Sequence, residues 1–197
     1  YVQYEGAIKE LPRYASTIGK KLLILVASIP EQVEKLISES MNSDCKACMN
    51  YEIAKTNSRY AGYFKNADYY DKLREGMEYE FLEIVDSIPS EKNIERVANY
   101  VKEKGFDTVV GIGGGRGLDF TRGITHFIPV KVILVPTLAA TNASISTLSV
   151  IYSDDGSIIQ EYWRMNNAPD LTLVDTNIIL HNSPQVLASG IADITCT

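Results

Sequence analysis

Residues 109–122 read VVGIGGGRGLDFTR, and this stretch decides the fold. An apolar run passes directly into three consecutive glycines at positions 113–115, and then into a helix-compatible segment that contains Leu118 and Phe120. Glycines let the backbone approach a ligand closely, and the N–H groups and dipole at the start of a helix favour an anion. We therefore expect a strand, a glycine turn and a helix that bind a diphosphate group.

The spacing of these glycines matches neither of two common phosphate-binding motifs. In the register that starts at Gly111 and Gly113, the last glycine of the dinucleotide fingerprint falls on Arg116. No Gly-Lys-Ser/Thr follows, as a phosphate-binding NTPase loop would require. A tight strand-to-helix turn without a ligand is the alternative. Because three adjacent glycines exceed what a turn needs, the phosphate interpretation is favoured.

The rest of the chain alternates short β-branched apolar runs with longer amphipathic stretches, a pattern typical of βαβ units. Helices are predicted from Glu31 to Ser40, and from Glu91 to Lys104 with Ser90 as the N-cap. We expect an α/β fold with a twisted, mostly parallel sheet and helices on both faces. The predicted strands are Leu22–Ala27, Tyr79–Val85, Thr108–Ile112, Lys131–Val135 and Leu171–Val174.

Two segments depart from this pattern. Residues 150–163 form two alternating runs around Asp155 and Gly156, which predicts a tight β-hairpin that lies outside the main sheet as a flap. Residues 41–76 are rich in tyrosine and have no clear period, so we interpret them as a possible insertion. Its Cys-Lys-Ala-Cys spacing lacks a second cysteine pair or a nearby histidine, and we interpret these cysteines as ordinary thiols.

The composition is that of an ordinary globular protein. Of the 197 residues, 45% are hydrophobic and 22% are charged, and this length allows one domain, or one domain with the beginning of a second. The net charge of −6 argues against nucleic acid or an anionic membrane as a partner. No apolar run approaches the roughly 20 residues that cross a bilayer. With only three cysteines, we expect a cytoplasmic protein.

A second polar segment follows the strand predicted at Lys131–Val135. Residues 135–152 read VPTLAATNASISTLSVIY and carry many hydroxyl and amide groups. Ligands of open α/β sheets bind in crevices at the carboxyl ends of the strands, so this segment is a candidate binding loop. A polar surface loop that satisfies its own backbone is an equally good interpretation.

Several sequence strings together resemble the glycerol dehydrogenase branch of the iron-containing, metal-dependent alcohol dehydrogenase superfamily. A weaker similarity extends over residues 4–25. The order and spacing of several motifs make the resemblance specific, and it implies the fold of a dehydroquinate synthase-like N-terminal domain. The strings are VVGIGGGRGLDFTR at 109–122, VPTLAATNASISTLSVIY at 135–152, PDLTLVDTNII at 169–179 and LASGIADITCT at 187–197.

The resemblance implies NAD(P)-dependent, metal-assisted oxidation of a polyol or secondary alcohol. It implies that the pyrophosphate of the cofactor binds at Gly113, Gly114, Gly115, Arg116, Gly117, Leu118 and Asp119. The remaining length of the cofactor and its nicotinamide end would be lined by Thr137, Ser146, Leu148 and Tyr152. Asp193 matches an aspartate that, with two histidines further along the family's chain, binds a catalytic Zn²⁺ or Fe²⁺.

Departures from the family pattern limit these expectations. Asn142 stands near the substrate position where glycerol dehydrogenases usually have Asp, and an amide cannot act as a base. The family commonly has Lys where this chain has Arg116 and Arg122. After the first of the predicted strands no acidic partner for a ribose is visible, which leaves NAD and NADP open. We interpret His126 and His181 as surface or capping groups rather than metal ligands.

The chain stops four residues beyond Asp193. We therefore expect a dinucleotide-binding α/β domain over residues 1–182, followed by the first helix of a truncated helical metal-binding domain over residues 183–197. Such a chain would bind dinucleotide and small alcohols but turn over little by itself, and a full-length chain would form a homo-oligomer. The alternatives are a non-catalytic dinucleotide-binding or interaction module and a glycerol-1-phosphate dehydrogenase-like enzyme.

Overall fold

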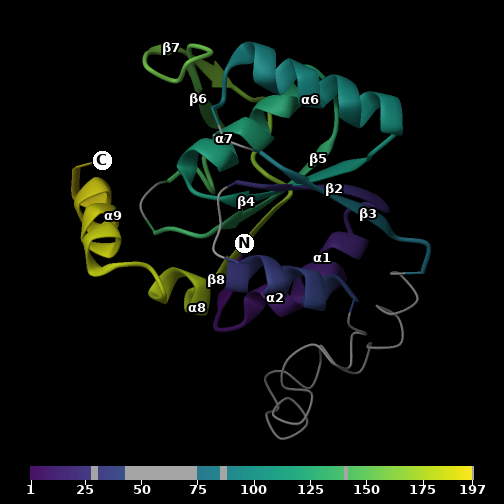
Figure 1. Ribbon diagram of the computed structural model, residues 1–197, viewed down its shortest axis with the longest axis horizontal. Coiled ribbons are helices and arrows are strands. Elements are labelled where there is room, and N and C mark those ends of the chain that lie inside the picture. The colour runs from purple at the N-terminus through teal and green to yellow at the C-terminus, as the bar shows by residue number, and fades with distance from the viewer. Residues whose placement is uncertain (28–30, 43–74, 85–87, 140–141, 197) are drawn as a thin grey trace, which may run out of the picture.

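The computed structural model describes residues 1–27, 31–42, 75–84, 88–139 and 142–196 (Figure 1). A six-stranded sheet lies at its centre, and every neighbouring pair of its strands is parallel. The strand order is β1-β8-β5-β4-β2-β3. These strands are β1 (Val2–Tyr4), β2 (Lys21–Val26), β3 (Glu78–Glu83), β4 (Thr108–Gly113), β5 (Lys131–Pro136) and β8 (Leu171–Asp175). The predicted α/β fold and its five strands are confirmed, whereas the three-residue edge strand β1 was not predicted.

Helices cover both faces of this sheet, as expected (Figure 1). One core holds the apolar side chains of α6 and α7 against one set of alternate strand residues, and the other core holds those of the N-terminal helices against the opposite set. This alternation follows from the period of two in a strand. The helices are η1 (Ala7–Glu10), α1 (Leu11–Ser16), α2 (Glu31–Asn42), α6 (Glu91–Lys104), α7 (Gly115–Gly123), η2 (Ile124–His126), α8 (Thr176–Leu180) and α9 (Pro184–Cys196).

Helix α6 shows how closely the sequence determines its ends. The Ser90 hydroxyl accepts a hydrogen bond from the N–H of Asn93 at 3.4 Å and thereby caps the first turn. Gly105 follows the last turn with a φ of 71°, a left-handed conformation that favours glycine. The predicted boundaries of this helix, Glu91 to Lys104, are confirmed.

The predicted hairpin exists and forms a separate two-stranded antiparallel sheet of β6 (Leu148–Tyr152) and β7 (Ile159–Arg164). It is longer than the predicted range of 150–163. Asp155 and Gly156 lie in its turn as predicted, with Gly156 at a φ of 70°, but the turn is wider than that of a tight hairpin. The connection is residues 153–158, and Ser153 donates its N–H to the carbonyl of Ile158 at 2.9 Å. The reason is that the Asp155 carboxylate binds Ser153 and Ser157 and so stabilises a wider loop.

Most of the segment 41–76 lies outside the described residues, and the interpretation of an insertion and of its cysteines therefore stays a prediction. Its first two residues belong to α2. Helix α9 forms where the first helix after the α/β domain was expected, and it lies at one side of the molecule (Figure 1). The division into two domains also stays a prediction. In the described part of the chain, no helix is long and apolar enough to cross a membrane.

Candidate functional site

The turn between β4 and α7 presents backbone N–H groups without a side chain to cap them. Gly114 is the N-cap of α7, and no side chain forms a capping hydrogen bond there. By contrast, Ser90 caps α6 and Asp175 caps α8. The first intrahelical bond of α7 joins the N–H of Leu118 to the carbonyl of Gly114 at 3.1 Å. The preceding N–H groups have no acceptor within the helix, so they can donate to an anion.

Glycines bring the start of α7 directly onto the end of β2. A Cβ atom on Gly113 would lie 2.8 Å from the Cβ of Ala27, and one on Gly117 would lie 2.5 Å from it. Gly117 therefore allows close packing of the helix on the sheet, as the last glycine of a dinucleotide fingerprint does. The spacing of the glycines still departs from that fingerprint, because a match that ends at Gly117 would begin at Ile112.

Arg116 places a positive charge in the first turn of α7. Its side chain is exposed, and its guanidinium carbon lies 4.7 Å from the centre of the Tyr152 ring at the end of β6. The first turn contains no acidic residue. A cation is disfavoured at the positive end of a helix dipole, and a bound anion would offset this cost. The structure thus brings together two predicted cofactor residues from distant segments.

Two other residues expected at the glycine turn are directed into the protein. Leu118 is fully buried in the core, and its N–H is already used by the helix. Asp119 is 7% exposed, and its carboxylate pairs with the guanidinium of Arg122 one turn later. Burial raises the pKa of Asp119, while the hydrogen bond and charge of Arg122 act to lower it. Asp119 therefore interacts with the helix rather than with solvent at the turn.

The carboxyl ends of β4 and β5 meet at the same edge of the sheet. The N–H of Thr137, directly after β5, donates to the carbonyl of Gly113 at 3.0 Å. The carbonyl of Thr137 accepts from the amide of Asn182 at 2.7 Å. Thr137 is 7% exposed, and these two hydrogen bonds hold its backbone beside the glycine turn.

The polar segment after β5 partly satisfies its own backbone. The exposed Asn142 accepts hydrogen bonds at its carbonyl from the N–H groups of Ile145 and Ser146, both at 3.1 Å. The Ser146 hydroxyl accepts from the N–H of Leu148 at 2.9 Å. These contacts agree with the interpretation of a self-capping loop, in the way that Ser and Asn stabilise turns. The loop contacts α7 through Arg122, near the end of the helix that lies away from the glycine turn.

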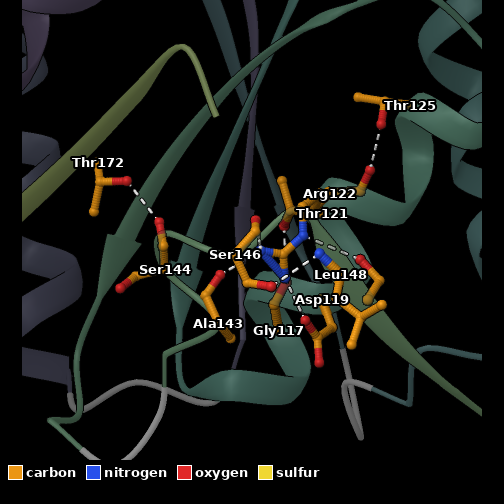
Figure 2. A network of polar contacts seen from close by, with 11 residues as sticks. Gly117, Asp119, Thr121, Arg122, Thr125, Ala143, Ser144, Ser146, Leu148 and Thr172 are labelled. Atoms are coloured by element: carbon orange, nitrogen blue, oxygen red, sulfur yellow. Dashed lines mark hydrogen bonds and ion pairs between the residues drawn. The ribbon is translucent and has the colours of Figure 1, made fainter. Parts of the chain in front are cut away.

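The centre of this region is Arg122, which sequence reasoning did not assign to the site (Figure 2). Only 1% of it is exposed. Its Nε atom donates to the Ser149 hydroxyl at 3.2 Å, and its Nη1 atom donates to the carbonyls of Ala143 and, at 2.8 Å, Ser146. The spacing of three residues from Asp119 places both charges on one helix face and could have indicated the pair.

The described residues do not form a metal site. Among them, no group of three or more His, Cys, Asp or Glu side chains could hold a metal ion. His126 stacks on Trp163 with 4.2 Å between ring centres, and His181 contacts the carbonyl of Asn177 at the end of α8. Asp193 belongs to α9, but its side chain lies outside the described part, so its role as a ligand stays a prediction.

A cavity of about 1020 Å³ lies at the amino-terminal ends of β5 and β8, and Arg122 is among the residues that line it. Its charged groups are already paired within the protein. Lys131 forms an ion pair with Asp170 at 2.9 Å, and the Asp107 carboxylate accepts from the N–H of Lys20 at 2.9 Å. Ligands of parallel sheets bind at the other end, so this cavity is not the candidate site.

Comparison with known proteins gives consistent results. A family model described as iron-containing alcohol dehydrogenase matches residues 56–176, which is more than half of the chain. The chain is 39% identical over 104 residues to glycolaldehyde reductase of Halobacterium salinarum, covering 53% of this chain and 28% of that protein. It is 37% identical over 108 residues to glycerol dehydrogenase of Escherichia coli O6:H1, covering 55% of this chain and 29% of that protein.

Solved structures with the same fold include a probable glycerol dehydrogenase from Sinorhizobium meliloti 1021. It has a TM-score of 0.73 at 23% identity, over 98% of this chain and 43% of that chain. Glycerol dehydrogenase from Schizosaccharomyces pombe has a TM-score of 0.67 at 21% identity, over 99% and 41%. At these identities the likeness establishes the fold alone. The chain spans less than half the length of these neighbours.

Proposed function

Because this chain belongs to the iron-containing alcohol dehydrogenase family, we propose that it binds a nicotinamide dinucleotide at the turn between β4 and α7. The observation that carries this proposal is the uncapped start of α7, which consists of glycines and lies at the carboxyl edge of a parallel sheet. Pyrophosphate supplies the acceptors that these N–H groups lack. The relatives that bear dehydrogenase and reductase names support the same conclusion.

In this proposal the backbone binds the pyrophosphate, and side chains contribute charge. The N–H groups of Gly115, Arg116 and Gly117 donate to phosphate oxygens, because they precede the first intrahelical bond. Gly113 and Gly114 leave room for the close approach of the ligand to the backbone. The Arg116 guanidinium adds a charge-assisted contact from the exposed side of the turn.

The loop after β5 and the hairpin contribute the surface that binds the nicotinamide end of the coenzyme. We propose that four residues line this surface. They are Thr137, which lies next to Gly113; Ser146 and Leu148, which lie in the loop region; and Tyr152, which lies beside Arg116. The nicotinamide supplies the hydride acceptor or donor when it is bound. Asn142 is proposed to face the substrate, where its amide can donate or accept a hydrogen bond and orient a hydroxyl without acting as a base.

The proposed reaction is the interconversion of a small alcohol or polyol and the corresponding carbonyl compound. Support comes from the names of the relatives, which are glycerol dehydrogenases and a glycolaldehyde reductase. We further propose that the coenzyme is NAD or NADP and that the metal is Zn²⁺ or Fe²⁺, bound in part through Asp193. The proposed assembly is a homo-oligomer in the cytoplasm. Each follows from the family resemblance.

Titration with NADH and NADPH tests the coenzyme proposal. Trp163 is the single tryptophan of the chain and belongs to the hairpin beside the site, so energy transfer from it to the reduced nicotinamide reports binding. Gly114→Asp places a carboxylate at the N-cap, where it caps the free N–H groups and repels phosphate. We expect saturable binding by the wild type and at least tenfold weaker binding by Gly114→Asp, about 1.4 kcal/mol.

Gly114→Asn is the matched control for charge. It offers a neutral side chain of almost the same shape, which also caps the helix. We expect its affinity to lie between those of the wild type and of Gly114→Asp. If neither coenzyme binds to the folded wild-type chain, or if all three proteins bind equally, the glycine turn is not the pyrophosphate site.

A further inference from the structure

We propose that Arg122 and Thr172 are positioning residues that hold the loop between β5 and β6 in the shape that binds the nicotinamide end of the coenzyme. This inference rests on the proposed function. The loop has no regular secondary structure over residues 142–147. Its own hydrogen bonds use the carbonyl of Asn142 and the hydroxyl of Ser146, so the carbonyls between them depend on partners outside the loop.

Side chains from two regular elements supply these contacts. Arg122 of α7 donates through Nη1 to the carbonyls of Ala143 and Ser146. Thr172 of β8 donates its hydroxyl to the carbonyl of Ser144 at 2.6 Å. Figure 2 shows both donors directed at the loop, one from the helix and one from the strand. Three of four consecutive carbonyl groups are thus bound from outside the loop.

Both donors are buried, and Arg122 is also held by contacts outside the loop. Arg122 is 1% exposed and Thr172 is 5% exposed. The other nitrogens of the guanidinium bind Asp119 and Ser149, so a planar group with a fixed fork contacts both loop carbonyls at one defined angle. Groups whose own geometry is locked by a second set of contacts are the ones that preorganise a binding site.

Inward-facing carbonyls determine which side chains of the loop face outward. With the carbonyls of 143, 144 and 146 held, Asn142 remains exposed and Ile145 exposes 57% of its surface. Ser146 turns its hydroxyl to the N–H of Leu148. A loop that is already ordered loses less conformational freedom when a ligand binds, and this raises affinity without new ligand contacts.

Hydrogen exchange in the absence of coenzyme tests whether the loop is held. The N–H groups of Ile145, Ser146 and Leu148 are hydrogen-bonded within the loop and report its order. Thr172→Val removes one hydroxyl at constant shape, and Arg122→Lys keeps the charge but loses the fork. We expect at least tenfold faster exchange at these three positions in both variants.

NADH affinity tests whether this order serves the coenzyme. Thr172→Val and Arg122→Lys are expected to weaken NADH binding about fivefold to tenfold. Thr172→Ser keeps the hydroxyl and is expected to restore wild-type exchange and affinity. Thr17→Val is the control, because the Thr17 hydroxyl donates to the carbonyl of Tyr14 at 2.7 Å at the end of α1 and contacts neither Arg122 nor the loop.

The outcomes separate this proposal from the proposed function. A wild-type chain that binds neither NADH nor NADPH contradicts the proposed function, and that titration needs no variant. If the wild type binds NADH while Thr172→Val matches it in exchange or in affinity, the positioning role is overturned. Thr172→Val tests the positioning role by itself, even if Arg122→Lys does not fold. Faster exchange with weaker binding in Thr172→Val, reversed in Thr172→Ser, supports it.

Discussion

A methyl group on Gly117 would lie 2.5 Å from the Cβ atom of Ala27, closer than two carbon atoms can approach. Neither atom belongs to a flexible side chain, so the start of α7 would have to move away from β2. We predict that Gly117→Ala lowers the free energy of unfolding by about 1–3 kcal/mol, the usual cost of overpacking a core. Urea denaturation followed by Trp163 fluorescence measures this value.

Ala27 offers a direct control for this steric conflict. Ala27→Gly removes the opposing methyl group, so the double variant with Gly117→Ala should regain part of the lost stability, giving a favourable coupling between the two positions. If Gly117→Ala lowers the free energy of unfolding equally with and without Ala27→Gly, the close contact is not the cause of the destabilisation.

Local patterns were sufficient to predict most of the fold. The strand β4, the glycine turn and α7 follow each other within a few residues, and Ser90 and Gly105 delimit α6 by contacts within one turn. The strand β1 could not be predicted in this way. It has three residues and pairs with β8, so that Val2 lies opposite Leu173. A strand this short is defined by its partner, which lies far away in the sequence.

Arg116 is expected to contribute to coenzyme affinity through its charge. We predict that Arg116→Gln weakens NADH binding about threefold to tenfold, because one charge-assisted contact to phosphate is lost. Arg116→Lys should retain more of the affinity, since the charge remains and only the fork is lost. Isothermal titration at two salt concentrations checks this, and the wild type should lose more affinity at high salt than Arg116→Gln does.

Tyr152 provides a test of how Arg116 is oriented. Its ring lies under the guanidinium, and Tyr152→Phe keeps that ring whereas Tyr152→Leu removes it. We expect Tyr152→Phe to bind NADH like the wild type and Tyr152→Leu to bind as weakly as Arg116→Gln. An unchanged affinity in Tyr152→Leu would contradict the role of the ring.

The sequence predicted the glycine turn of the candidate site but not the buried contacts of Arg122. Free N–H groups follow from the sequence because the glycines and the helix are adjacent. The contacts of Arg122 could not be read in the same way, since its partners Ala143, Ser146 and Ser149 lie more than 20 residues away. A charged side chain in an amphipathic pattern suggests solvent, and only the fold shows that this one is buried.

The hairpin loop should lose part of its stability in acid. Hydrogen bonds from the Ser153 hydroxyl and from Ser157 lower the pKa of Asp155 from its ordinary value of 3.8 to about 2. Because the folded-state pKa is the lower one, the stabilisation is present above pH 3.8 and disappears as the pH falls through about 2. A carboxyl ¹³C titration should give a midpoint near 2 for Asp155.

A variant lacking both hydroxyls checks the cause of that shift. In Ser153→Ala with Ser157→Ala, the Asp155 midpoint should move toward 3.8, because only the backbone donors of Ser157 and Asp155 remain. The stability difference between the wild type and Asp155→Asn should likewise be greatest above pH 3.8. A midpoint that stays at about 2 in the double variant would assign the shift to another group.

The ion pair of Asp119 and Arg122 is buried. Removing one member of a buried ion pair leaves an uncompensated charge, so we expect Arg122→Met to lower the free energy of unfolding by about 3–5 kcal/mol at neutral pH. Burial already raises the pKa of Asp119, and the loss of Arg122 removes the group that opposes this shift. The pKa of Asp119 is then higher in the folded state than in the unfolded state. Its charged carboxylate therefore destabilises the fold fully above the folded-state pKa, and this destabilisation fades as the pH falls toward the unfolded-state pKa. Denaturation at several pH values should therefore show that the difference in the free energy of unfolding between Arg122→Met and the wild type becomes smaller in acid. Combined with Asp119→Asn, which leaves no carboxylate to protonate, Arg122→Met should lose this pH dependence and cost less than the sum of the single variants. A constant difference between Arg122→Met and the wild type at all pH values would mean that the pair contributes shape rather than charge.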